Sequence, residues 1–137
     1  MKIMIKKQVD SDAVAKTVMI SKAGRFLIMR VSENERYLGQ WDLPGGHLIV
    51  GEDPIDGLIR EVYEETGLIL KNITHKNLFY MQGKVTYYKT ELPVGQVKLS
   101  SEHDKYRFIK LSEIDDYDIS EKFKKAIRYA YRYSPRS

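Results

Sequence analysis

The sequence contains no cysteine and no long hydrophobic run. Without cysteine, disulfides and thiolate metal sites are excluded. No apolar stretch approaches the roughly 18 residues of a membrane-spanning helix. Residues 1–7 also lack the long apolar stretch of a signal peptide. We therefore expect a protein without a membrane association, located in the cytoplasm.

The composition that remains is typical of a globular domain. Hydrophobic residues make up 42% of the chain and charged residues 31%, and no repeat, linker or low-complexity segment is visible. A length of 137 residues is ordinary for one domain with a real core. We therefore expect a single domain over residues 1–137, whose oligomeric state stays open, a homodimer included.

A helix with clear signals at both ends is predicted in the middle of the chain. Asp53 is a favourable N-cap, Pro54 suits the first helical position, and Gly67 suits a left-handed C-terminal stop. At about 100° per residue, one side of this helix is apolar and the other is charged. The apolar side comprises Ile55, Leu58, Ile59, Val62 and Thr66, and the charged side comprises Arg60, Glu61, Glu64 and Glu65.

The three carboxylates on the charged side point to a bound cation. Like charges within roughly 5 to 6 Å repel and weaken a helix unless positive charge offsets them. Arg60 supplies part of that charge, and a hard cation would supply more. Oxygen ligands without His or Cys nearby favour Mg²⁺, or Mn²⁺, over zinc. The glycine at position 57, one turn before Glu61, leaves room for a phosphate or marks a tight packing contact.

The spacing of these residues matches a known signature. Gly46 is followed after five residues by Glu52, and after seven more by Arg-Glu-Val-Tyr-Glu-Glu-Thr-Gly-Leu at positions 60–68. The chain therefore resembles the Nudix hydrolases at every signature position. An ordinary helix with a solvated acidic face explains neither the flanking glycines nor Glu52. The resemblance covers nearly the whole chain and implies the Nudix α/β/α sandwich, in which a mixed β-sheet lies between helices.

The resemblance also implies roles for single residues. The expected metal ligands are Glu61, Glu64, Glu65 and the backbone carbonyl of Gly45. Glu52 and Arg60 would brace the glutamate side chains, as metal ligands generally require. The attacking water would be positioned or deprotonated by Glu61 or by Glu102, which stands in the loop 101–104. A plain surface charge explains Glu102 about as well.

The expected reaction is the Mg²⁺-dependent hydrolysis of a phosphoanhydride in a nucleoside diphosphate linked to another group. The negative charge of a pyrophosphate repels a nucleophile, and bound cations stabilise the leaving phosphate. Residues 39–46 resemble the lead-in of the MutT-like branch, which favours a nucleoside triphosphate or a related nucleotide as substrate. The alternatives are an ADP-ribose or dinucleoside polyphosphate hydrolase, an RNA 5′ pyrophosphohydrolase, and a non-catalytic nucleotide-sensing module.

Basic and aromatic residues outside the signature can be explained by a structural role or by a functional one. A basic, tyrosine-rich helix near the C-terminus can follow RNA. A helix docked on the core and capped by Ser120 is the favoured interpretation, because an apolar stripe runs along it. That stripe comprises Phe123, Ala126, Ile127 and Ala130. The aromatic residues able to stack a base are Tyr37, Phe79, Tyr80 and Tyr88, although each is more often core or surface.

Strands are expected where Val, Ile, Met and Phe are frequent. The expected strands span residues 13–20, 25–32, 68–82, 84–92 and 106–111. The first two would form a hairpin around the turn 22–24. A short strand at Trp41 would lead into a turn at Gly45 and Gly46.

Overall fold

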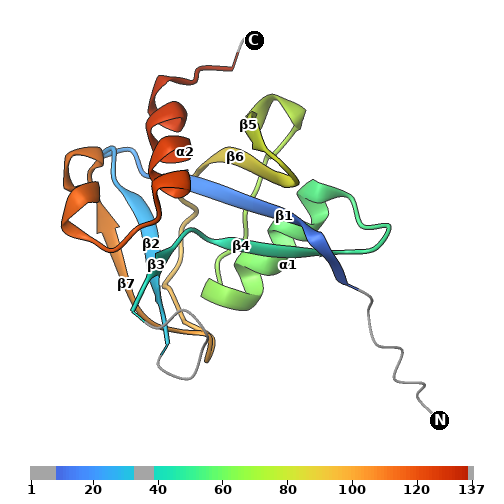
Figure 1. The fold of residues 1–137 in the computed structure, drawn as a ribbon, viewed down its shortest axis with the longest axis horizontal. Helices are drawn as coiled ribbons and strands as arrows, with labels where there is room; N and C mark the ends of the chain where they lie inside the picture. The colour runs from blue at the N-terminus through green and yellow to red at the C-terminus, as the bar shows by residue number, and fades with distance from the viewer. Residues whose placement is uncertain (1–8, 33–38, 136–137) are drawn as a thin grey trace.

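A computed structural model describes residues 9–32 and 39–135 of the chain (Figure 1). Within these ranges, seven strands, two α-helices and two short 3-10 helices alternate along the chain. In order they are β1 (Val9–Ile20), β2 (Phe26–Val31), β3 (Trp41–Asp42), β4 (Gly45–Ile49), α1 (Pro54–Thr66), η1 (His75–Asn77), β5 (Leu78–Gln82), β6 (Val85–Glu91), β7 (His103–Ile109), η2 (Leu111–Asp116) and α2 (Glu121–Arg132).

The strands form one mixed sheet that divides beside β1. Strand β1 runs parallel to β6 along residues 14–20 and pairs antiparallel with β4. The expected hairpin is confirmed at its turn, where Ile20 pairs with Phe26. Strand β2 then turns to β7 and β3 as partners. The short β3 and β4 therefore fill the opening between β1 and β2.

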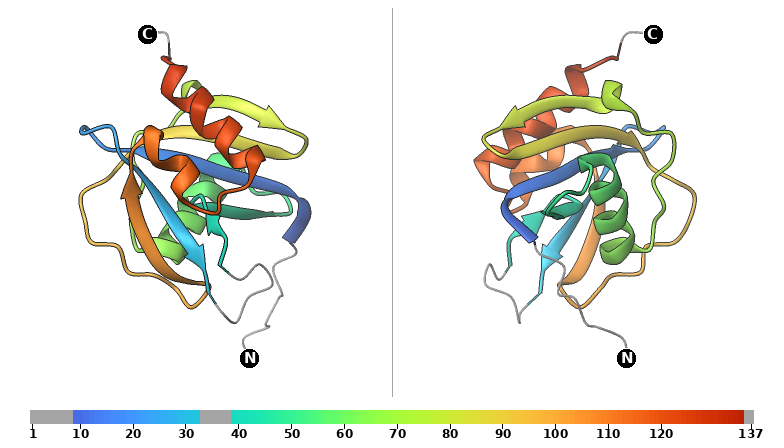
Figure 2. Two further views of the ribbon diagram at one scale, coloured as in Figure 1. Left: turned by 60° about the vertical axis from the view of Figure 1, so that its left-hand side comes forward. Right: turned by 90° about the vertical axis from the view of Figure 1, so that its right-hand side faces the viewer.

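The two helices cover opposite faces of the sheet (Figure 2). Alternate side chains of β2 enter two separate cores: Phe26 and Ile28 pack on the α2 side, while Leu27 and Met29 pack on the α1 side. The expected architecture of a mixed sheet between helices is confirmed.

Helix α1 begins and ends where its sequence signals predict. The Asp53 side chain accepts a hydrogen bond from the Ile55 amide at 2.8 Å, and Gly67 closes the helix in the left-handed conformation with φ 74°. The placement of Glu65 on the charged side was wrong, because this residue is only 5% exposed. Glu65 follows Leu58 by seven residues, which is almost two full turns, so both side chains face the sheet.

Two other predicted boundaries differ from the structure. Gly45 and Gly46 do not form a turn but begin β4, and the chain bends one step earlier, at residues 43–44. The predicted strand over residues 68–82 is confirmed only from Leu78 onward. Asn72, with φ 59°, interrupts it, and Thr74 caps the 3-10 helix that follows.

The C-terminal helix is docked on the core, as its apolar stripe predicts. Ser120 accepts a hydrogen bond from the amide of Phe123 at 3.2 Å, and Ala126, Ile127 and Ala130 are fully buried against the sheet. Among the described residues, no helix combines the length and the apolar character needed to cross a membrane.

Gly45 lies where β4 comes closest to β1. Its φ is +124°, and a Cβ atom built on it would lie 2.1 Å from the carbonyl oxygen of Ala15. The oxygen belongs to the backbone, and the backbone of residue 45 fixes the position of the Cβ, so neither atom can rotate away. Only glycine is therefore compatible with this crossing.

We expect Gly45→Ala to lower the free energy of unfolding by roughly 3 kcal/mol or more, because overpacking adds to backbone strain. Gly51→Ala is the matched control, since Gly51 has φ +83° but open space around its Cα. Strain alone should cost that control about 1 to 2 kcal/mol. Urea unfolding of both variants without metal measures the difference, and equal losses would show that the contact with Ala15 is unimportant.

Candidate active site

Arg60 gathers three of the acidic side chains predicted for the site. Its guanidinium forms a two-pronged pair with Glu52, with distances of 2.9 and 3.0 Å. Its Nη1 also donates to Glu61 at 3.1 Å and to Glu64 at 2.6 Å. The hydrogen bonds to Glu52 are the largest cause of the raised pKa of Arg60. Arg60 is thus a fixed positive charge that holds the carboxylates in place.

Glu52 connects Arg60 to the strand β4 and to the start of α1. One of its oxygens accepts a hydrogen bond from the Ile49 amide at 3.0 Å. A Cβ atom on Gly57 would lie 2.8 Å from the same carboxylate oxygen and 2.4 Å from Leu48. Of the two explanations for Gly57, the tight packing contact therefore holds.

Glu61 lies over the backbone of Gly46. A Cβ atom at Gly46 would meet the carboxylate of Glu61 at 2.7 Å. Burial raises the pKa of Glu61, Arg60 opposes that effect, and the nearby charges of Glu64 and Glu102 raise the pKa further. The first residue of the signature, Gly46, thus lies against a glutamate from its last part, Glu61.

Glu65 points into the protein rather than toward solvent. Its Oε1 accepts a hydrogen bond from the amide of Gly45 at 2.9 Å. Burial raises the pKa of Glu65 to about 7, although Lys16 and the Gly45 amide act in the opposite direction. This carboxylate can therefore hold or release a proton near neutral pH.

Glu102 lies on the loop that connects β6 to β7 and packs against the C-terminal turn of α1. The amide of Ser100 donates to the backbone oxygen of Glu65 at 3.1 Å, and Ser32 donates to the backbone oxygen of Glu102 at 2.9 Å. These two bonds anchor the loop, while the Glu102 side chain is exposed. The charge of Glu102 raises the pKa of Glu61, so this loop lies near the carboxylates of the signature.

Lys16 is a residue of the site that the sequence analysis missed. Its ammonium donates three hydrogen bonds, to Asp42 Oδ1 at 3.0 Å, to the Leu43 oxygen at 3.0 Å and to the Gly45 oxygen at 3.1 Å. Burial lowers its pKa, but the charge of Asp42, helped by those of Glu65 and Glu61, raises it overall. The available signal was a lysine in the middle of the mostly apolar stretch 13–20.

Asp42 and His103 complete this buried group and were also missed. His103 Nε2 lies 3.3 Å from Asp42 Oδ2, and its ring is only 5% exposed. Burial raises the pKa of Asp42, but Lys16 and the hydrogen bond with His103 lower it overall. His103 Nδ1 has no hydrogen-bond partner among the described residues.

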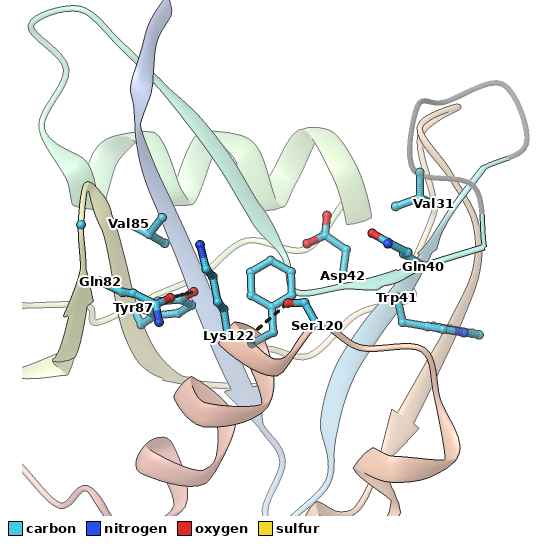
Figure 3. A pocket seen from close by; sticks show the side chains of 11 residues that line it. Val31, Gln40, Trp41, Asp42, Gln82, Val85, Tyr87, Ser120 and Lys122 are labelled. Atoms are coloured by element: carbon cyan, nitrogen blue, oxygen red, sulfur yellow. Dashed lines mark hydrogen bonds between the residues drawn. The ribbon is translucent and has the colours of Figure 1, made fainter.

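A cleft of about 650 Å³ opens beside Asp42, on the α2 side of the sheet (Figure 3). Figure 3 shows Gln40, Trp41 and Asp42 on one side, and Gln82 and Tyr87 on the other. The remaining lining residues are Val31, Gly83, Val85, Ser120, Lys122 and Phe123. The size and the mixture of rings with a few polar groups suit a small organic ligand.

Of the aromatic residues considered for base stacking, Phe79, Tyr80 and Tyr88 do not line this cleft. Tyr88 is buried in the core facing α1, and Phe79 and Tyr80 pack against the core facing α2. Tyr37 lies outside the described residues. The rings that do line it come from β3, β6 and α2, so no local pattern in the sequence brings them together.

The donor set suits a hard divalent cation, although it is not drawn together into a ready cage. Within residues 9–32 and 39–135, no three acidic or imidazole side chains converge closely enough to hold a metal. Arg60 holds one oxygen each of Glu61 and Glu64, and Glu65 is turned toward Gly45. Glu61 and Glu65 nevertheless both contact the start of β4, at Gly46 and Gly45.

Comparisons with known proteins agree with this arrangement. The family model of the NUDIX domain matches residues 11–131. A MutT-like protein of Streptomyces ambofaciens is 45% identical over 51 residues, which are 37% of this chain and only 30% of that protein. The asymmetrical bis(5′-nucleosyl)-tetraphosphatase of Rattus norvegicus is 28% identical over 119 residues, covering 79% of each chain. The MutT crystal structure from Methanosarcina mazei superposes with a TM-score of 0.72 at 30% identity, covering 88% of this chain and 92% of that one.

We expect the metal-free protein to lose stability as its buried carboxyl ionises. Because the pKa of Glu65 rises from 4.5 to about 7 on folding, its contribution is complete below pH 4.5 and is lost as the pH rises through 7. This loss is at most about 3 kcal/mol. Glu65→Gln keeps an acceptor for Gly45 without the charge, so it should gain that amount over the wild type between pH 4.5 and 8.

Denaturant unfolding in EDTA at several pH values measures this gain. Glu64→Gln is the control, because it removes the same charge from the same helix at a side chain that is 53% exposed. A Glu65→Gln protein whose stability changes with pH in parallel with the wild type would contradict the buried, proton-binding carboxyl.

Proposed function

Because the chain belongs to the Nudix family of hydrolases, which act on phosphorus-containing anhydrides, we propose that its substrate is a nucleoside triphosphate or a related nucleotide. The observation that carries this proposal is the position of the cleft. Lys16 bonds the Gly45 oxygen, and its ammonium lies 5.7 Å from the ring of Phe123, which lines the cleft. The ligand cleft and the carboxylates of α1 thus lie on either side of one lysine.

The cation would be Mg²⁺, with Mn²⁺ as an alternative. Glu61, Glu64 and Glu65 would hold it with the carbonyl oxygen of Gly45. When bound, Mg²⁺ would neutralise the phosphate oxygens and stabilise the leaving group. Arg60 and Glu52 would keep the glutamates oriented, because their two-pronged pair fixes the guanidinium against β4.

The proton of the attacking water would pass to Glu102. This carboxylate is exposed on an anchored loop and faces Glu61. Glu61 is the alternative, but its Oε1 accepts a hydrogen bond from Arg60. One oxygen of Glu61 is thus occupied by Arg60, whereas the Glu102 side chain is exposed to water.

The cleft would hold the organic part of the substrate. The partly exposed rings of Trp41 and Phe123 offer stacking surface, worth about 1 to 3 kcal/mol for a base. The amides of Gln40 and Gln82 can each donate and accept hydrogen bonds with a nucleobase edge. This combination favours a nucleotide over a purely aliphatic diphosphate.

A dinucleoside polyphosphate is the second candidate substrate. The similarity to the rat tetraphosphatase spans 79% of both chains, unlike the short match to the MutT-like protein. Such a substrate carries a second nucleoside, which would have to lie outside the cleft beside Asp42.

A panel of nucleotides with Mg²⁺ tests the proposal, with products identified by mass. Nucleoside triphosphates should be cleaved fastest, and dinucleoside tetraphosphates, ADP-ribose and triphosphorylated RNA more slowly. Glu64→Gln should lower turnover by orders of magnitude, because it removes a ligand charge. Asp56→Asn, on an exposed residue of the same helix, should not. Faster cleavage of a tetraphosphate would favour the second candidate, and no cleavage of any compound would refute the proposal.

Glu102→Gln should lower kcat about 10²- to 10⁴-fold and flatten the acidic limb of the pH–rate profile, because the variant cannot accept the proton. The profile is measured at saturating Mg²⁺ with the best substrate of the panel. Glu121→Gln serves as the control, since this exposed glutamate lies at the start of α2. An unchanged profile would assign the proton to Glu61 instead.

A further inference from the structure

A buried chain of contacts connects the Gly45 carbonyl, a proposed metal ligand, to the loop that carries Glu102. Lys16 connects the carbonyl oxygens of Leu43 and Gly45 to Asp42, and Asp42 is in turn bonded to His103. His103 directly follows Glu102 and begins β7. We call these three side chains, Lys16, Asp42 and His103, the Lys–Asp–His bridge.

All three members of the bridge are withdrawn from solvent. Lys16 is 8% exposed, His103 is 5% exposed, and the side chain of Asp42 is 20% exposed. A buried ion pair of this kind is weak support for stability, because losing hydration offsets much of the attraction. What such a pair does provide is a fixed geometry for the groups that it contacts.

We propose that the Lys–Asp–His bridge positions the candidate cation site, with Lys16 fixing the Gly45 carbonyl and His103 fixing the loop of Glu102. The inference rests on the proposed function, because it concerns the ligands assigned there. None of the three residues belongs to the Nudix signature, and each acts as a positioning residue.

The geometry requires the compact ammonium of lysine. Its three N–H groups match three acceptors, one carboxylate and two backbone oxygens, all within 3.1 Å. A guanidinium spreads its donors over a planar fork and cannot place three of them around one point. The carbonyl of Gly45 has two lone pairs, so one can accept from Lys16 while the other faces the cation.

Charge and position predict opposite effects on cation binding. If Lys16 acted only through its charge, removing it would strengthen Mn²⁺ binding, because a positive charge repels a cation. If it positions the Gly45 carbonyl, removing it should weaken binding. The double variant Lys16→Met with Asp42→Asn separates these effects, since it leaves the net charge unchanged.

We expect this double variant to bind Mn²⁺ about 10- to 100-fold more weakly than the wild type in calorimetry without nucleotide. The control removes the exposed pair on β1 and the β5–β6 turn, Asp12→Asn with Lys84→Met, and should stay within twofold. His103→Phe should weaken binding in the wild type and have no further effect in the double variant, because it acts through Asp42. Equal or tighter binding by a folded double variant would overturn the proposal.

Lys16→Arg decides the matter if the double variant does not fold. It keeps the positive charge, so wild-type Mn²⁺ affinity in this variant would overturn the proposal, while a loss of tenfold or more supports it. The carbonyl ¹³C shift of Gly45 in the metal-free protein should also move in Lys16→Arg and not in the control. If the wild type hydrolyses nucleotides but these variants bind Mn²⁺ as it does, only the bridge is refuted. A wild type that binds no Mn²⁺ refutes the proposed function as well.

Discussion

The close crossing of two strands at Gly45 is the constraint on which the rest of the site depends. Strand β4 lies so near β1 that no side chain fits between the Cα of Gly45 and the oxygen of Ala15. The same approach presents the Gly45 amide to Glu65 and its carbonyl to Lys16. A larger residue would push β4 away from β1 and so move the Gly45 carbonyl away from Lys16. Gly45 therefore acts mainly by allowing the close approach of the two strands, and this approach in turn positions the polar groups of the site.

Two basic side chains, Arg60 and Lys16, pair with the carboxylates around this crossing. Arg60 takes Glu52, Glu61 and Glu64 at the outer, partly hydrated end, whereas Lys16 takes Asp42 and faces Glu65 in the interior. Like carboxylates so close together would otherwise repel each other strongly. Burial, which Lys16 opposes only in part, leaves the pKa of Glu65 near neutrality. The charges of Lys16 and Asp42 thus balance each other on the inner side. On the outer side, one arginine faces three carboxylates, and the remaining negative charge favours a further cation.

The elements that the sequence predicts well are those whose signals are local. Asp53, Pro54 and Gly67 set the ends of α1 by contacts within a few residues, and the apolar stripe of α2 repeats along one helix. Glu65 was misplaced although its spacing from Leu58 already put the two on one face. The strand predicted from residue 68 failed because Asn72 adopts a left-handed conformation that hydrophobicity does not reveal. The Lys–Asp–His bridge and the ligand cleft were missed because their members come from strands and a helix that only tertiary structure assembles.

The parallel pairing of β1 with β6 has a consequence for how the site is assembled. Val14 pairs with Val85, a partner about 70 positions later in the chain, and β1 also carries Lys16. Contacts of such long range close large loops and slow the search for the native topology. During synthesis, β1 must wait, unpaired on that edge, until β6 has emerged. We therefore expect the candidate cation site around Lys16 to reach its final arrangement only after β6 has paired with β1.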